Sequence, residues 1–345
     1  MSIVERMWYG DDARARLARA ALAPASWLYG VAVGVRAWRF DHTDGAIHLT
    51  ALPVLSVGNL TVGGTGKTPV AAWAARTLQS RGARPAIVMR GYGDDEPIVH
   101  ARLNPTVPVI VDADRVAGTA RAAYAGADCV ILDDAFQHRR IARVSNWALV
   151  SAERWRDDLR LLPAGPLREP VGALARADIL LVTRKSAALS VAARIGERLL
   201  AQQPTLRVAV CHLAFDALVN DGTQERRPVS WLSGRRVVAA AAVGDSAAFF
   251  AQLEAAGASV DARAYRDHHA FTRADLAELV VVADRCDGLV CTLKDAVKLG
   301  PLWPANAAPL WYVSQIAVIE RGVAELDRAL EKVLAARQGV TSIAG

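Results

Sequence analysis

The chain has 345 residues, of which 52% are apolar and 22% charged, so it is long enough for about two domains and too apolar for a disordered protein. Its net charge of +6 is concentrated between Ala13 and Phe40, where five arginines and no acidic residue occur; the remainder carries only about +1, which argues against a general nucleic-acid surface. The four cysteines are scattered, mostly in apolar runs, and lack metal-binding spacing, which indicates reduced thiols in a cytosolic compartment.

The first element in chain order is the N-terminal segment, residues 1–40, which includes this basic stretch. It holds an uncharged run from Ala20 to Val35, which at sixteen residues falls short of the ~20 that span a bilayer. Arginines that flank an aromatic-rich apolar stretch are typical of a helix lying on an anionic membrane surface. The alternative is a helix packed on the protein's own core. We expect an amphipathic, membrane-associated segment.

A glycine-rich loop follows the apolar run 52–57 and leads into an alanine-rich helical pattern from Pro69. Such a strand, turn and helix N-terminus form a cradle of backbone N–H groups for phosphate. Lys67 and Thr68 end a G-x-x-x-x-G-K-[ST] pattern in which threonine replaces the first glycine. The alternative is a turn that caps an ordinary helix. The loop predicts nucleoside triphosphate binding through Thr61, Val62, Gly63, Gly64, Thr65, Gly66, Lys67 and Thr68.

Strands and helices alternate after this loop. Short apolar strands are expected at 86–89, 107–111, 129–132, 147–150, 179–182 and 207–210, with helices at 115–124 and 188–201. This alternation predicts a parallel sheet covered on both faces. A second α/β unit is expected from strands at 237–243, 289–292 and 310–313 and helices at 247–256 and 321–337.

The expected fold class is therefore α/β, with two domains and an N-terminal membrane-contacting helix. Residues 41–219 form a P-loop-containing parallel-sheet domain, and residues 236–345 form a smaller α/β C-terminal domain with a closing helix. Turn-rich residues between them predict a hinge at 220–235.

Paired carboxylates, Asp133 and Asp134, end the predicted strand 129–132. In P-loop enzymes an acidic residue at a strand end holds the Mg²⁺ that bridges the β- and γ-phosphates. Gln137 and His138 follow within one turn and could line the same cleft. The alternative is a polar strand end that faces solvent.

A second acidic cluster, Asp94-Asp95-Glu96, follows the strand 86–89 and Arg90-Gly-Tyr-Gly. Parallel sheets place ligands at the carboxyl ends of their strands, so a carboxylate here could accept a proton from a substrate hydroxyl. Spacing alone favours the alternative, a solvated acidic turn.

Two weaker motifs come later. The proline-flanked loop 161–170 presents Arg168 and Glu169, and such an arginine could clamp a transferring phosphoryl group or lie on a simple surface loop. In Asp267-His268-His269, one histidine could serve in acid–base or hydrogen-bonding chemistry, while a helix cap by Asp267 is the alternative.

Taken in order, these motifs resemble those of the tetraacyldisaccharide 4'-kinases, the lipid A kinases of Gram-negative envelope synthesis. The resemblance covers nearly the whole chain and is carried by Gly58-Asn59 with the Gly-Gly-Thr-Gly-Lys-Thr loop, Arg90-Gly-Tyr-Gly, Asp95-Glu-Pro, Asp133-Asp-Ala-Phe-Gln-His, Leu162-Pro-Ala-Gly-Pro-Leu-Arg-Glu, Asp267-His-His and Thr292-Leu-Lys-Asp-Ala-Val-Lys. It implies transfer of the γ-phosphate of ATP, with Mg²⁺, to the 4'-hydroxyl of a tetraacyldisaccharide 1-phosphate at the cytoplasmic face of the inner membrane. The implied partners are this lipid and anionic lipids, with no nucleic acid; the oligomeric state is left open.

The resemblance also implies residue roles. Asp95 would be the base that acts on the sugar hydroxyl, supported by His268 from the second domain, and Arg168 would lie at the transferring phosphate. Lys67 and Gln137 would serve the nucleotide, and the metal set would be Thr68, Asp133, Asp134 and Glu169.

Three positions depart from the family pattern. A longer insert usually separates Arg-Gly-Tyr-Gly from Asp-Glu-Pro, and its absence here leaves open whether Asp94 or Asp95 is the base. Ala135 replaces a usual glycine, and Leu293 replaces a usual glutamate.

The main rival is a membrane-associated P-loop switch ATPase of the partitioning and cell-division class. Its loops carry a signature lysine immediately before the paired glycines, where this chain has Val62. A mere interaction module would leave Lys67, Asp133 and Arg168 unexplained.

Overall fold

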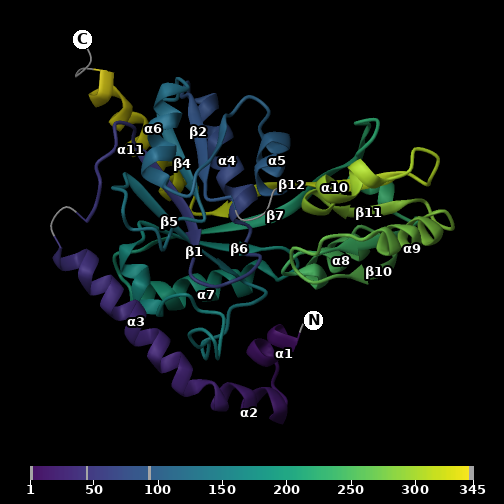
Figure 1. Cartoon of the computed structure of the whole chain (residues 1–345), viewed down its shortest axis with the longest axis horizontal. Coiled ribbons are helices and arrows are strands. Elements are labelled where there is room, and N and C mark those ends of the chain that lie inside the picture. The colour runs from purple at the N-terminus through teal and green to yellow at the C-terminus, as the bar shows by residue number, and fades with distance from the viewer. Residues whose placement is uncertain (1–2, 44–45, 92–94, 342–345) are drawn as a thin grey trace.

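The computed structural model describes residues 3–43, 46–91 and 95–341. In these ranges twelve strands form one sheet of order β10-β9-β11-β12-β7-β6-β5-β1-β4-β2-β3, with β8 paired to β7 outside this path. Figure 1 shows the sheet running through the whole molecule.

The N-terminal half is built on parallel strands with helices between them. Its strands are β1 (Val54–Asn59), β2 (Pro85–Met89), β3 (Val109–Val111), β4 (Cys129–Asp133), β5 (Ser145–Ser151) and β6 (Ile179–Arg184). Its helices are α4 (Lys67–Ser80), α5 (Asp95–Leu103), α6 (Arg115–Tyr124) and α7 (Leu189–Gln202). The predicted strands and the helix 115–124 are confirmed, whereas α5 was not predicted because its nine residues carry no clear apolar stripe.

The C-terminal half repeats this pattern on a smaller scale. It contains β9 (Arg236–Ala241), β10 (Ser259–Ala264) and β11 (Leu289–Thr292), with α8 (Ser246–Ala255), α9 (Arg273–Ala283) and α10 (Leu293–Leu299). The chain then returns to the N-terminal half through the closing helix α11 (Val323–Thr341). Short 3₁₀-helices lie at Val171–Arg176, Val229–Leu232 and Gly300–Leu302.

Two long antiparallel strands, β7 (Arg207–Asn220) and β12 (Leu310–Arg321), join the halves. Their pairing runs from Trp311 opposite Asn220 to Arg321 opposite Val210 (Figure 1). The sequence predicted only four residues of each, because their remaining parts mix buried and half-exposed side chains instead of forming an apolar run. The turn-rich residues after Asn220 form a hairpin to β8 (Arg226–Pro228).

Apolar side chains cover both faces of the parallel strands, as predicted. Helices α4 and α11 pack on one face, where Leu78 and Leu330 are fully buried. Helix α7 covers the other face with Leu199. The cysteines are free thiols; three of them are buried, and burial raises the pKa of Cys129 to about 12.

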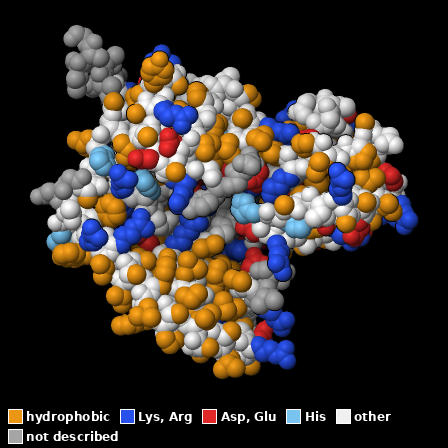
Figure 2. Space-filling model, viewed as in Figure 1, with side chains coloured by type: hydrophobic (Ala, Val, Ile, Leu, Met, Phe, Trp, Pro, Cys, Tyr) orange, Lys and Arg blue, Asp and Glu red, His pale blue; other side chains and the backbone are white. Residues whose placement is uncertain are grey.

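Three helices precede the sheet: α1 (Ile3–Tyr9), α2 (Ala13–Ala21) and α3 (Ala23–His42). One side of α3 is hydrogen-bonded to the loop 161–170. Ser26 donates to the carbonyl of Leu162 at 3.1 Å, and Tyr29 donates to the carbonyl of Arg168 at 2.8 Å. Figure 2 shows hydrophobic side chains gathered over the lower part of the molecule, where Figure 1 places α2 and α3. Across the described residues, no helix combines the length and apolar character needed to cross a membrane.

Candidate active site

A cavity of about 600 Å³ opens between the glycine-rich loop and the C-terminal half. Its apolar side is formed by side chains of both halves, including Val99, Leu213 and Phe249. Ten predicted site residues line it: Val62, Gly63, Gly64, Thr65, Gly66, Lys67, Thr68, Asp134, Arg168 and His268.

The glycine-rich loop is held in shape by backbone geometry and buried hydrogen bonds. Gly63 and Gly66 have φ values of +101° and +80°, which side chains with a Cβ rarely adopt. A Cβ on Gly66 would also lie 2.2 Å from Leu213 Cδ1. Asn59 donates to Thr65 Oγ1 at 3.1 Å, and Thr183 donates to the Thr65 carbonyl at 2.8 Å. The loop thus directs the N-terminus of α4 toward the cavity, as anion binding requires.

The missing first glycine is explained by the position of Thr61. Its backbone forms an antiparallel bridge with Leu167, and Val62 donates to the Pro166 carbonyl at 2.8 Å. Extended backbone of this kind suits threonine as well as glycine. Thr61 is buried beneath the loop and does not line the cavity.

Asp134 forms the electrostatic centre of the cavity. Its Oδ1 lies 3.7 Å from Lys67 Nζ and 2.9 Å from Arg168 Nη1. Burial by itself would raise the pKa of Asp134, but Lys67 and Arg168 outweigh it, and the pKa is lowered. The structure therefore brings an ionised carboxylate and two cations from three distant motifs together.

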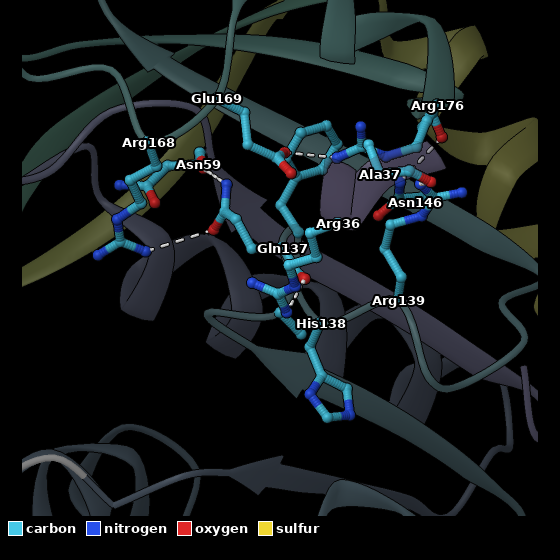
Figure 3. A network of polar contacts seen from close by, with 12 residues as sticks. Arg36, Ala37, Asn59, Gln137, His138, Arg139, Asn146, Arg168, Glu169 and Arg176 are labelled. Atoms are coloured by element: carbon cyan, nitrogen blue, oxygen red, sulfur yellow. Dashed lines mark hydrogen bonds and ion pairs between the residues drawn. The ribbon is translucent and has the colours of Figure 1, made fainter. Parts of the chain in front are cut away.

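Two members of the predicted metal set point elsewhere. Asp133 Oδ2 is 2.8 Å from His100 Nε2, and both side chains are buried. Glu169 pairs with Arg176 at 2.5 Å (Figure 3). Neither carboxylate lines the cavity, and within residues 3–43, 46–91 and 95–341 no three His, Cys, Asp or Glu side chains are grouped as a metal site.

Gln137 lies beside the cavity without lining it. Its amide donates to the Asn59 carbonyl at 2.9 Å and accepts from Arg168 Nη1 at 3.5 Å, as Figure 3 shows. Gln137 therefore supports both the end of β1 and the arginine.

The acidic cluster is bound to the C-terminal half. Asp95, 6% exposed, has its Oδ2 3.4 Å from Lys298 Nζ, and Glu96 pairs with Lys294 at 2.9 Å. Burial would lower the pKa of Lys294, but Glu96 outweighs this effect and raises it. Of the two carboxylates only Glu96 lines the cavity, and Asp94 lies outside the described residues.

His268 enters the cavity from the C-terminal half. Its φ is +61°, and its backbone N–H donates to the Ala242 carbonyl at 3.2 Å. The alternative that Asp267 caps a helix is wrong, because the N-cap of α9 is Thr272, whose side chain accepts from the backbone of Asp275. Asp267 lines the cavity instead.

Comparisons with known proteins bear on this arrangement. Residues 18–96 and 94–335 match the family model described as tetraacyldisaccharide-1-P 4'-kinase. A tetraacyldisaccharide 4'-kinase of Halorhodospira halophila is 39% identical over 333 residues, which cover 90% of this chain and 91% of the relative. One of Anaeromyxobacter sp. (strain Fw109-5) is 35% identical, with both chains covered completely.

The chain belongs to the tetraacyldisaccharide 4'-kinase family. A crystal structure of the Aquifex aeolicus family member in complex with ATP has a TM-score of 0.70 and 27% identity, covering 91% of this chain and 99% of that one. The mixed α/β fold with a mostly parallel sheet matches that neighbour.

In this chain the cavity is also lined by Lys185 and Asp245, charged residues that the sequence did not single out. Lys185 Nζ lies 3.3 Å from Asp245 Oδ2, and Arg154 donates to the Gly244 carbonyl. These contacts tie the loop after β9 to the N-terminal half. Lys185 directly follows the carboxyl end of β6, so the rule that parallel sheets place ligands there could have identified it.

Proposed function

We infer that the protein transfers the γ-phosphate of ATP to the 4'-hydroxyl of a tetraacyldisaccharide 1-phosphate in lipid A biosynthesis. The family match over nearly the whole chain carries this inference. It is supported by a cavity in which Lys67, Asp134 and Arg168 meet at a phosphate-binding loop. A switch ATPase of the partitioning class is not favoured, because its signature lysine is replaced by Val62.

The nucleotide phosphates would bind at the N-terminus of α4, against backbone N–H groups of the loop. Lys67 and Arg168 would then neutralise charge on the transferring phosphoryl group, which is where this chemistry is accelerated. Both cations already lie within 4 Å of Asp134, so little reorganisation is needed when the anion arrives.

The site fits Mg²⁺ through oxygen donors. Thr68 and Asp134 line the cavity, and Mg²⁺ in kinases is typically bound by one or two protein oxygens together with phosphates and water. When bound, the ion would supply positive charge that neutralises the phosphate oxygens. We propose Thr68 and Asp134 as its protein ligands, with Asp133 positioning Asp134 by accepting its backbone N–H at 2.8 Å.

For the acceptor we propose Asp95 as the base. It lies in the first turn of α5, buried beside the cavity, and a carboxylate there can take the proton of the sugar hydroxyl. Lys298, which belongs to α10, lies 3.4 Å from Asp95 Oδ2. The sugar hydroxyl would therefore reach Asp95 when α10 moves away. The long strands β7 and β12 connect the halves, and we propose that the predicted hinge at 220–235, which begins where β7 ends, allows this movement.

We also propose that α3 lies on the cytoplasmic face of the inner membrane. The side of α3 opposite Ser26 and Tyr29 exposes an apolar stripe at helical spacing, formed by Trp27, Leu28, Val31, Val35 and Trp38. Arg39 is exposed on the same helix, where it would meet anionic headgroups, whereas Arg36 donates to the Gln137 carbonyl at 3.2 Å. The two interpretations from the sequence are thus compatible, because one face packs on the core and the other is free for lipid.

The test is acceptor-dependent ADP release with Mg-ATP and the tetraacyldisaccharide 1-phosphate in vesicles. The account predicts little ADP without the acceptor; nucleotide-dependent dimerisation with acceptor-independent hydrolysis would favour the switch ATPase. For the membrane, Trp27→Gln with Trp38→Gln should weaken binding to anionic vesicles, and salt should weaken it further. Unchanged binding would place the contact elsewhere.

A further inference from the structure

A second cavity, of about 280 Å³, lies behind the active site and is lined by three arginines from different elements. Arg76 comes from α4, Arg102 from α5 and Arg226 from β8. The cavity shares Leu103, Leu293 and Gln315 with the lining of the active-site cavity, so these side chains lie between the two.

Arg76 has no ion pair among the residues that the structure describes. Both of its hydrogen bonds use Nη1 and are long: 3.4 Å to the Leu103 carbonyl and 3.3 Å to Asn104 Oδ1. Burial lowers its pKa, and Asp216 only partly offsets this. A partly desolvated guanidinium that still has unused N–H donors is stabilised when an anion binds and accepts hydrogen bonds from it.

The other two arginines have carboxylate partners but are not fully neutralised as a group. Arg102 pairs with Asp221 at 2.5 Å, and Arg226 pairs with Asp216 at 2.8 Å. Three positive charges thus face two negative ones, and only Asp216 among the carboxylates lines the cavity. Tyr312, Ser314 and Gln315 add polar groups from β12.

We propose that this cavity binds a small phosphate-class anion, such as inorganic phosphate or diphosphate. Arginine presents forked donors that match phosphate oxygens, and one excess positive charge favours an anion over a neutral ligand. The volume lies just below the ~300–1,000 Å³ of typical small-molecule pockets, which suits such an anion better than a whole nucleotide.

The position of the site connects it to the kinase reaction. Arg76 lies on the helix whose first residues are Lys67 and Thr68, while Arg226 lies on β8 and Tyr312 on β12, one of the two strands that join the halves. A bound anion would therefore tie α4 and α5 to β8 and β12. Any change that the bound anion makes in nucleotide affinity would be matched by an equal change that the nucleotide makes in anion affinity, because linkage between two sites is reciprocal.

The test is calorimetric titration of inorganic diphosphate into full-length protein saturated with a non-hydrolysable ATP analogue and excess Mg²⁺, so that the phosphate-binding loop is already occupied. We expect one further site whose affinity falls with added KCl. Arg76→Met and Arg226→Met should each weaken it at least tenfold, since each removes one charge-assisted contact. Arg121→Met, which removes a 62%-exposed arginine paired with Asp112 away from this cavity, should leave it unchanged.

Separate titrations of inorganic phosphate and ADP distinguish a free anion from the phosphates of a nucleotide. Arg226 has a 58%-exposed side chain, so its variant keeps the test valid if Arg76→Met fails to fold. The proposal is overturned if no further site exists, or if Arg226→Met binds diphosphate as tightly as the wild type. Kinase activity does not enter either readout, so this outcome is independent of the phosphoryl-transfer reaction.

Discussion

Asp95→Asn separates the proposed base from a merely structural carboxylate. The substitution keeps the size of a side chain that is only 6% exposed, so it creates no cavity. Its main structural cost is the loss of the contact with Lys298 at 3.4 Å, and Lys298 retains a bond of 3.4 Å to the His269 carbonyl. Asp95 Oδ2 accepts no hydrogen bond from the described residues, so the substitution removes an ion pair and no hydrogen bond.

The expected kinetic effect is much larger. Removing a general base typically costs about 10²–10⁴-fold, so kcat should fall by that factor while the KM for ATP stays near the wild-type value. The assay is steady-state phosphoryl transfer at saturating Mg-ATP, with the melting temperature measured in parallel. Asp94→Asn, measured beside Asp95→Asn, shows which of the two neighbouring aspartates is the base. Glu96→Gln tests the neighbour that pairs with Lys294.

Two results would refute this reasoning. If Asp94→Asn is the more damaging variant, the base is one residue earlier than proposed. If Asp95→Asn retains a kcat within about threefold of the wild type, this cluster is not the base, since that loss lies far below the ~10²-fold minimum expected for one.

Three further substitutions test the remaining site. Lys67→Ala should lower kcat/KM on the order of 10²-fold or more, and near-wild-type turnover would contradict the phosphate-binding role of the loop. Asp134→Asn should weaken Mg-nucleotide binding measured by calorimetry, with partial recovery of rate at high Mg²⁺; a Mg²⁺-independent loss would remove Asp134 from the metal set. Burial lowers the pKa of His138 from 6.5 in the unfolded chain to about 4 in the folded protein. As the pH falls from about 6.5 to about 4, the unfolded chain takes up a proton that the folded protein does not, so the free energy of unfolding decreases over this range. The melting temperature of the wild type should therefore drop relative to that of His138→Gln across this window, and parallel profiles would show that His138 does not titrate as its burial implies.

The parallel strands and the glycine-rich loop could be predicted because their signals are local. A strand such as β4 is buried at all five positions, and its first four residues form a continuous apolar run. In contrast, β7 and β12 are held mainly by pairing with each other across about a hundred residues of sequence, and their mixed burial hides them from any local pattern. The predicted hinge and domain boundaries at 220–235 stay a prediction.

The candidate site was predictable in its residues but not in its pairings. Motif order identified Lys67, Asp134 and Arg168, which the fold brings together. Local spacing could not show that His100 binds Asp133 or that Arg176 binds Glu169, because those partners come from a helix and a 3₁₀ turn without a motif of their own. The two carboxylates held in these pairings, Asp133 and Glu169, do not line the cavity.

The central claim is tested most directly by the position of the transferred phosphate. Purified protein, Mg-ATP and tetraacyldisaccharide 1-phosphate in anionic vesicles should yield one new phosphomonoester, which phosphorus and proton NMR would assign to the 4' carbon, and Lys67→Ala protein should yield almost none. ATP consumption that leaves the disaccharide unmodified, or a phosphate at another hydroxyl, would contradict the account.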